Sequence, residues 1–342
     1  MKRADAVAVM LALAICGAAY GQFVENVSKV GTTSACFLEI EVGSRALAMG
    51  GAFVATANDA SALYWNAAGL ARLARSEVHL GHTEWLADMN YDFAGVALPL
   101  GNFGTLGASF CALGMDEMEV RTVFYPEGTG ERFGASDVAL GLSYARALTD
   151  RFSIGFTGKY IQQKIWHMSA SSFAIDVGTL FVTQLKGMRI GASMSNFGGK
   201  MRLEGKDTQV NHDIDPSKYG NNDKIIAHLA TDKWSLPLIF RAGVAMELVN
   251  AGHNRLTVAV DAIHPNDNTE YLNLGAEYAF NENVFLRAGY KSLFLRDGEE
   301  GLSLGGGLAY ELLGRVRLKL DYAYLDFGVL ENVQRFSIGL EF

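Results

Sequence analysis

This sequence has little proline, and its basic residues do not outnumber its acidic ones. Five of the 342 residues are proline and 38 are glycine, which indicates many turns and close strand packing rather than proline-rich linkers. Lys and Arg number 29 against 37 Asp and Glu, a formal net charge of −8. Because no basic run is present to neutralise phosphates, nucleic acid is not expected as a partner.

Cysteine is also scarce, with only three in the chain. Cys16 lies in an N-terminal apolar run, where the bulky Ile15 before it argues against a lipoprotein signal. Cys36 and Cys111 remain, and a disulfide between them is possible although no framework of cysteines supports it.

Long hydrophobic runs are missing after the N-terminus. Lys2 and Arg3 precede an apolar run over 6–20 that ends in small residues, so residues 1–21 are expected to be a secretory signal peptide. Every later apolar run is broken well short of about 18 residues, the length that a spanning helix needs. An exported protein of this kind can cross a membrane only as a closed β-barrel.

Period-two alternation of apolar and polar residues begins at Glu77 and continues to the last residue. In the clearest segment, 316–324, two tyrosines and three aliphatic residues alternate with charged or small ones. This pattern predicts one strand with a face toward lipid and a polar face. Counting such segments predicts an all-β protein, a transmembrane antiparallel barrel of about 14 strands. The expected strands are 77–86, 91–100, 104–114, 136–147, 151–165, 170–183, 187–197, 236–249, 255–264, 269–280, 283–295, 301–313, 315–326 and 333–342.

The lengths of the connections check this count independently. Alternate connections are short, and they are expected to be periplasmic turns. The intervening ones include 115–135 and 198–235, which are long and polar and are expected to face outside. A soluble β-sandwich or barrel would not favour aromatic residues on the apolar face near strand ends, where this chain has Tyr144, Tyr160, Tyr290, Tyr310 and Tyr322.

The C-terminus, FSIGLEF, has apolar residues at every second position and ends in Phe342. After a signal peptide and many alternating segments, this ending has the form of the closing-strand signal that barrel assembly machinery recognises, so that machinery and outer-membrane lipid are expected partners. The expected location is the outer membrane of a Gram-negative-type bacterium.

The stretch 43–71 breaks the alternating pattern, being rich in Ala and Gly. It is predicted to be a plug inside the lumen, with Asn58 and Asp59 capping a short helix over 60–65 and Asn66 and Gly69 ending it. The segment 22–75 is therefore assigned to the plug and 76–342 to the barrel. Candidate plug or gate residues are Arg45, Met49, Gly50, Gly51, Phe53, Asn58, Asp59, Tyr64, Trp65 and Asn66.

Charges of both signs fall on the inward faces of the expected strands. They are interpreted as a network that compensates itself and clamps the plug, with a charged lining that selects a permeant as the alternative. The main luminal charges are predicted to be Lys159, Asp176, Arg241, Glu247, Arg287, Arg317 and Asp321, and the same alternation places Arg189, Asp261, Glu277, Lys291 and Lys319 inward.

Local matches to enzyme motifs lack the structure that those motifs require. Residues 301–305 fit G-x-S-x-G by letters, yet that motif needs a strand-to-helix turn and here the chain continues as a strand. His79 and His82 have an odd spacing that puts them on opposite strand faces, which prevents shared metal ligation. No catalytic residue, cofactor or metal site is predicted.

The stretch SRALAMGGAFVATANDASALYWNAAGLA, residues 44–71, resembles the N-terminal signature of the PorV/PorQ family of outer-membrane proteins, within the FadL-like superfamily. Ala67 stands where family members often have Pro. The resemblance implies a barrel of about 14 strands with an N-terminal segment inside.

Two functions follow from this resemblance. One is a non-enzymatic accessory of type IX secretion, whose long outer loops contact secreted protein cargo and other secretion components. The other is a FadL-like transporter of hydrophobic small molecules with the plug as its gate; a purely structural barrel is the fallback. The accessory role predicts a plugged lumen and an adhesive rim, whereas the transporter predicts an apolar pocket beside the plug.

Overall fold

The computed structural model describes residues 29–342 apart from 221, 223, 296–297 and 313. The expected signal peptide, 1–21, lies outside the described residues. Within them, no helix is long and apolar enough to cross a membrane.

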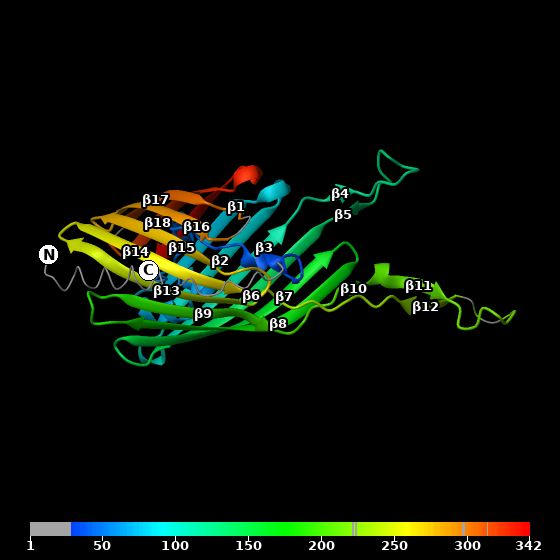
Figure 1. The fold of residues 1–342 in the computed structure, drawn as a ribbon, viewed down its shortest axis with the longest axis horizontal. Helices are drawn as coiled ribbons and strands as arrows, with labels where there is room; N and C mark the ends of the chain where they lie inside the picture. The colour runs from blue at the N-terminus through cyan, green and yellow to red at the C-terminus, as the bar shows by residue number, and fades with distance from the viewer. Residues whose placement is uncertain (1–28, 221, 223, 296–297, 313) are drawn as a thin grey trace.

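The wall of the molecule is a closed antiparallel β-barrel of 14 strands (Figure 1). Each strand pairs with its neighbours in chain order, and β1 pairs with β19 to close the ring. The strands are β1 (Glu77–Glu84), β2 (Asn90–Pro99), β3 (Thr105–Gly114), β6 (Ala135–Ala147), β7 (Phe152–Ile165), β8 (Met168–Val182), β9 (Arg189–Gly198), β13 (Ile239–Ala251), β14 (Asn254–Pro265), β15 (Tyr271–Phe280), β16 (Val284–Leu293), β17 (Leu302–Leu312), β18 (Val316–Asp326) and β19 (Asn332–Glu341). All 14 expected strands are confirmed, with small shifts at their ends.

The apolar and polar residues that alternate along the sequence lie on the outer and inner faces of the barrel wall. On β15, Leu274 and Tyr278 are exposed on the outside, whereas Asn273 and Glu277 are 1% exposed and point into the lumen. Apolar side chains outside and polar ones inside are the arrangement that lipid requires of a membrane barrel.

The connections at one end of the barrel are short. Asn281 and Glu282, in the three-residue turn between β15 and β16, both have φ of 53°, the left-handed backbone that tight hairpin turns use. We call this end the short-turn end and the opposite end the long-loop end; in outer-membrane barrels these are the periplasmic and extracellular ends.

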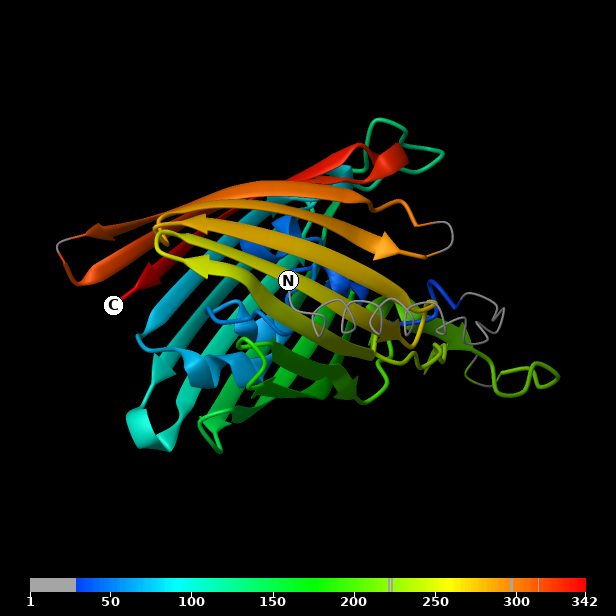
Figure 2. The ribbon, with the colours of Figure 1, turned by 60° about the vertical axis from the view of Figure 1, so that its left-hand side comes forward.

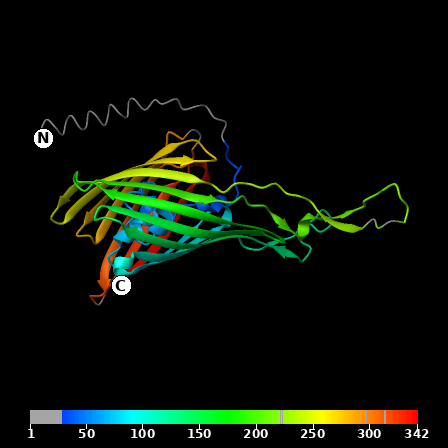
Figure 3. The same ribbon diagram turned by 90° about the horizontal axis from the view of Figure 1, so that it is seen from below.

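Two hairpins project from the long-loop end (Figures 1 and 3). The first is formed by β4 (Met118–Glu119) and β5 (Arg132–Phe133), and the second by β11 (Gln209–His212) and β12 (Ile225–His228). Short β10 (Glu204–Gly205) extends the pairing of β8 beyond the ring. Four 3-10 turns lie in connections: η3 (Leu86–Asp88), η4 (Gly101–Phe103), η5 (Lys206–Thr208) and η6 (Gly328–Leu330).

The N-terminal segment 35–73, which we call the plug, lies inside the barrel (Figure 2). It contains η1 (Cys36–Glu39), α2 (Ser44–Ala48), α3 (Ala62–Trp65) and η2 (Ala67–Arg72). Helix α3 confirms the expected helix, although its N-cap is Ser61. The N–H of Ser61 donates to the carboxylate of Asp59. Helix α2 was not predicted.

The prediction that Gly69 ends the helix was wrong. Gly69 lies within η2, and a Cβ there would stand 2.1 Å from the carbonyl oxygen of Ala57. The glycine is required by this close approach of two plug backbones and not by a helix stop.

Candidate functional site

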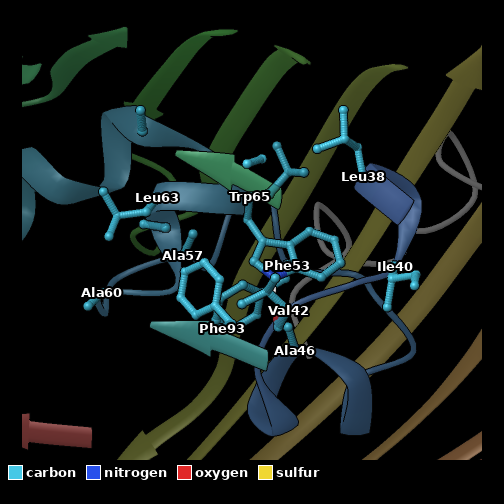
Figure 4. Packing of buried hydrophobic residues seen from close by; sticks show 14 of the residues in the cluster. Leu38, Ile40, Val42, Ala46, Phe53, Ala57, Ala60, Leu63, Trp65 and Phe93 are labelled. Atoms are coloured by element: carbon cyan, nitrogen blue, oxygen red, sulfur yellow. Dashed lines mark hydrogen bonds between the residues drawn. The ribbon is translucent and has the colours of Figure 1, made fainter. Parts of the chain in front are cut away.

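The plug has its own apolar core (Figure 4). Trp65 is 1% exposed and packs edge-on against Phe53 with ring centroids 5.9 Å apart. Its indole N–H donates to the carbonyl oxygen of Val42 at 2.8 Å, so the polar atom of this large side chain is satisfied inside the core. The plug is therefore a folded body and not a loose strap.

Strand glycines let the plug backbone touch the wall on opposite sides. A Cβ at Gly155 of β7 would lie 2.3 Å from the carbonyl carbon of Ala67, and one at Gly289 of β16 would lie 2.2 Å from the amide nitrogen of Gly50. Distances this short leave no room for any side chain. The fit between plug and wall is consequently closed at both contacts.

Ion pairs join the plug to the wall at the short-turn end of the lumen. Arg45 of α2 donates from Nε to Glu277 of β15 at 2.8 Å and from Nη1 to Asp59 of the plug at 2.9 Å. Glu277 also accepts from Arg287 at 2.8 Å and from Arg255 at 3.3 Å. Three guanidinium groups thus converge on one carboxylate that is 1% exposed.

Hydrogen bonds to backbone groups also hold the plug against the wall. Asp261 of β14 accepts from the amides of Phe53 and Val54 at 2.7 and 2.8 Å. Asn66 donates to the carbonyl oxygens of Val54 and of Thr179 in β8, at 2.9 and 3.0 Å. Since each bond satisfies a buried backbone group, these contacts fix the position of the plug.

The plug carboxyl groups are shifted in opposite directions. Burial works to raise the pKa of Asp59, but the guanidinium of Arg45 beside it holds the pKa below its ordinary value. Burial, reinforced by Asp267, raises the pKa of Glu39 to about 7, and burial also raises the pKa of Glu41. Asp59 is accordingly a charged partner of Arg45 at neutral pH.

The seven predicted luminal charges all come from inward positions. Lys159 and Asp176 form an ion pair of 2.6 Å, and Asp176 also accepts the backbone N–H of Asn196 at a bulge in β9. Arg287 bonds both Glu277 and Asp321. The interpretation of a self-compensating network is supported for these groups.

The remaining members are spread around the lumen. Glu247 pairs with Arg189 at 3.7 Å, and Arg317 donates to the carbonyl oxygen of Glu282. Arg241 donates to the hydroxyl of Ser195 and lies against the rings of Tyr64 and Trp65 in the plug. The structure therefore does not gather the seven charges into a single site.

A cavity of about 550 Å³ lies between the plug and the long-loop end; we call it the mouth cavity. Its apolar wall comes from the plug and from strand ends, through Phe37, Leu47 and Phe327 among others. Seven charged side chains also line it: Glu39, Glu41, Arg241, Asp267, Lys291, Glu300 and Arg335.

The two projecting hairpins carry exposed apolar side chains. At the apex of the β4–β5 hairpin, Val123 is 95% exposed and Phe124 88%, with Tyr125 also exposed. On the second connection Ile214 and Tyr219 are exposed as well. Exposed apolar residues grouped in this way are typical of protein interaction sites.

Sequence reasoning missed two buried groups of the site. Arg335 of β19 is 1% exposed and donates to the carbonyl oxygen of Glu41 and to Thr83. Arg335 alternates along its strand with the outward Phe336 and Ile338, so the sequence pattern could have placed it in the lumen. Glu41 lies in the non-alternating plug, where parity has no meaning.

The structure also shows where the two cysteines, the two histidines and the G-x-S-x-G match lie. Cys36 and Cys111 are both free thiols. His79 is 4% exposed in the lumen and His82 lies outside with Asp92, as their spacing predicted. Residues 302–312 continue as strand β17, so the G-x-S-x-G match has no nucleophile elbow.

Comparison with known proteins gives one family and one fold. A family model described as "Type IX secretion system protein PorV" matches residues 23–264. No protein with a curated description matches the sequence.

Several solved structures share the fold. The toluene transporter TodX of Pseudomonas putida is similar with a TM-score of 0.54 at 12% identity, over 88% of this chain and 97% of that one. The toluene transporter TbuX of Ralstonia pickettii gives a TM-score of 0.55 at 11% identity over the same shares. A FadL homologue of Pseudomonas aeruginosa gives 0.52 at 11% identity, over 86% and 96%.

Proposed function

This chain belongs to the PorV family of type IX secretion system proteins, and we propose that it is a non-enzymatic accessory of type IX secretion that handles exported protein cargo at the cell surface. Its place is the outer membrane of a Gram-negative-type bacterium, where the 14-strand barrel resides. The long-loop end faces the cargo.

The observation that carries the proposal is the joint arrangement of a clamped plug and exposed apices. The plug is held on opposite walls by backbone contacts at Gly155 and Gly289 and by the pair Arg45–Glu277. At the same time, Val123, Phe124 and Tyr125 are exposed at the apex of the β4–β5 hairpin, which projects from the long-loop end. An occupied lumen with an adhesive rim fits a protein that binds macromolecules outside.

Transport of a hydrophobic small molecule receives less support. The solved toluene transporters share the fold at 11–12% identity, and fold alone does not carry function. The mouth cavity beside the plug has a mostly apolar lining, as a transporter requires, but seven charged side chains also line it, more than the few polar groups that are typical of sites for apolar ligands.

The test is a secretion assay in the native host with the apex of the β4–β5 hairpin changed. The variant Val123→Ser/Phe124→Ser/Tyr125→Ser should lose surface-attached and released cargo while its barrel stays abundant in the outer membrane. The matched control is Leu148→Ser/Leu185→Ser, which removes exposed apolar residues at the short-turn end. Unchanged secretion by the apex variant would contradict the proposal for this hairpin.

A further inference from the structure

One part of the short-turn rim carries basic side chains without acidic partners. The turn that joins β6 to β7 and the turn that joins β8 to β9 are neighbours there, because β6, β7 and β8 are consecutive in the sheet. Arg146 is exposed at the end of β6, Arg151 in the turn that follows and Lys186 in the turn after β8. Within the part of the chain that the structure describes, none of the three forms an ion pair.

An exposed aromatic residue lies beside these cations. Phe103, in η4 between β2 and β3, is 79% exposed. Thr105 of β3 pairs with Ala145 of β6, so Phe103 and Arg146 are close neighbours on the rim. The carbonyl oxygen of Phe103 accepts the hydroxyl of Tyr144, an outward residue of β6, at 2.7 Å. The η4 turn therefore lies against the outer wall and not over the lumen.

The position of Tyr144 gives the level of the cations relative to the bilayer. Tyrosine concentrates at the interface between the hydrocarbon core and water. Arg146 follows two residues later on the same face, and at about 3.3 Å per residue it lies about 7 Å nearer the short-turn end. The headgroup region adds about 5–7 Å on each side of the hydrocarbon core. Arg146 is therefore at the level of the lipid phosphates of the leaflet at the short-turn end.

Two turns elsewhere on the rim show the contrast. The turn between β13 and β14 contains Gly252 and His253, and the turn between β15 and β16 is Asn281–Asn283. Arg255, next to these turns, already pairs with Glu277 at 3.3 Å. Neither turn combines an unpaired Lys or Arg with a large apolar side chain, so contact with lipid alone does not require the combination at β6–β9.

We propose that this part of the rim binds an anionic phospholipid of the adjacent leaflet, with the lipid phosphate at Arg146 and Arg151 and the acyl chains along the outward faces of β3 and β6. Guanidinium groups donate paired hydrogen bonds to phosphate oxygens, and Lys186 adds a third positive charge. Phe103 and the exposed Leu106 cover the acyl methylene groups next to the headgroup.

The chemistry of the surface matches this ligand. Basic side chains are attracted to anionic lipid, and apolar side chains at the same level gain from burial among the acyl chains. A zwitterionic lipid supplies the same chains but no net charge, so it fits less well. The inference adds to the proposed function without resting on it, because it concerns the wall at the short-turn end and not the surface that faces cargo.

The experiment measures lipid binding to the full-length protein by native mass spectrometry from mild detergent. The probes are phosphatidylglycerol, phosphatidylcholine with the same chains, and glycerol 3-phosphate as a competitor. Phosphatidylglycerol should bind at least about tenfold tighter than phosphatidylcholine, because each Lys or Arg near an anionic lipid changes the affinity about fivefold. Glycerol 3-phosphate has no acyl chains and should not compete at equal concentration. Equal affinity for the two lipids, or competition by glycerol 3-phosphate, would overturn the proposal.

A triple variant locates the contact. Arg146→Gln/Arg151→Gln/Lys186→Gln should abolish the preference for phosphatidylglycerol, because it removes all three unpaired cations of this part of the rim. Folding is checked by the shift in electrophoretic mobility on heating. A folded triple variant that keeps the full preference would contradict the assignment.

The matched control removes the same charge at the other end of the barrel. Lys200→Gln/Lys206→Gln/Lys233→Gln, at exposed positions of the long loops, should retain the preference. Loss of the preference in this control as well would show that total charge, and not the rim, decides the binding, and would overturn the proposal.

A photoreactive probe that keeps all three cations covers the case in which the triple variant does not fold. A benzoylphenylalanine in place of Phe103 is cross-linked in the native outer membrane, and the adducts are identified by mass spectrometry. An adduct with an anionic phospholipid, enriched over its share of the membrane lipid, supports the site. An adduct with a second protein, or with lipids in proportion to their abundance, would overturn it.

Discussion

Nε of Arg45, in the plug, lies 2.8 Å from Oε2 of Glu277, in the wall, although 232 residues separate them in the chain. The same carboxylate accepts from Arg287 and Arg255. One buried side chain therefore links the plug to two neighbouring strands of the barrel, and the stability of the closed state should depend on it.

Replacing Glu277 by Gln should lower the free energy of unfolding by about 3–5 kcal/mol, because three arginines lose their shared buried counter-charge. Urea unfolding in detergent, followed by tryptophan fluorescence, measures the change. Glu282→Gln is the matched control, since Glu282 pairs with Arg255 from a side chain that is 52% exposed, and its loss should cost about 1 kcal/mol or less. Equal effects of the two variants would contradict the account of the network.

Gly289→Ala should disturb the contact between plug and wall. Its Cβ would stand 2.2 Å from the nitrogen of Gly50, so the plug must shift, at a cost of about 1–3 kcal/mol. Gly306→Ala is the control, because a Cβ there meets nothing closer than 3.5 Å on the outward face of β17. Limited proteolysis of the plug should be faster in the first variant alone; identical digestion rates would argue against close packing.

The pH dependence of stability should contain a component from Glu39. Its pKa is raised by burial to about 7 in the folded protein, so the folded state binds a proton more tightly than the unfolded state does. Its contribution to stability is present in full below the unfolded pKa, near 4.3, and is lost as pH rises through about 7. Glu39→Gln should remove this decline.

The component from Asp59 has the opposite sign. Arg45 holds its pKa below the ordinary value, so the unfolded state binds the proton more tightly. Its contribution is present above the unfolded pKa, about 3.9, and is lost as pH falls through the lower folded pKa. Since the Asp59 component lies below about pH 3.9, unfolding curves of the unmutated protein and of Glu39→Gln between pH 4 and 8 isolate the Glu39 component, and an unchanged profile would contradict the shift assigned to Glu39.

The wall was predictable from the sequence because side-chain parity in a strand is a local property. Alternation gave all 14 strands and placed Glu277 and Asp261 inside, since neither fact depends on distant residues. The alternation of short and long connections then predicted which end of the barrel carries the short turns and which carries the long loops.

The interior was predictable only in part. Parity says that Arg287 points inward, but its partners Glu277 and Asp321 depend on the register between strands. The plug has no alternation to interpret, so α2 and the role of Glu41 were invisible. The bulge at Asn196 likewise arises from pairing between β8 and β9 and has no signal in either strand alone.

Under the proposed function, the barrel binds protein at its outer end while its lumen stays closed. The most direct measurement is affinity purification of the tagged protein from its own outer membrane in mild detergent, with co-purifying proteins and lipids identified by mass spectrometry. The account predicts secreted proteins that share a C-terminal domain, and their loss from the Val123→Ser/Phe124→Ser/Tyr125→Ser variant. Recovery of a defined fatty or aromatic ligand with no protein cargo would contradict it and identify the plug as a transport gate.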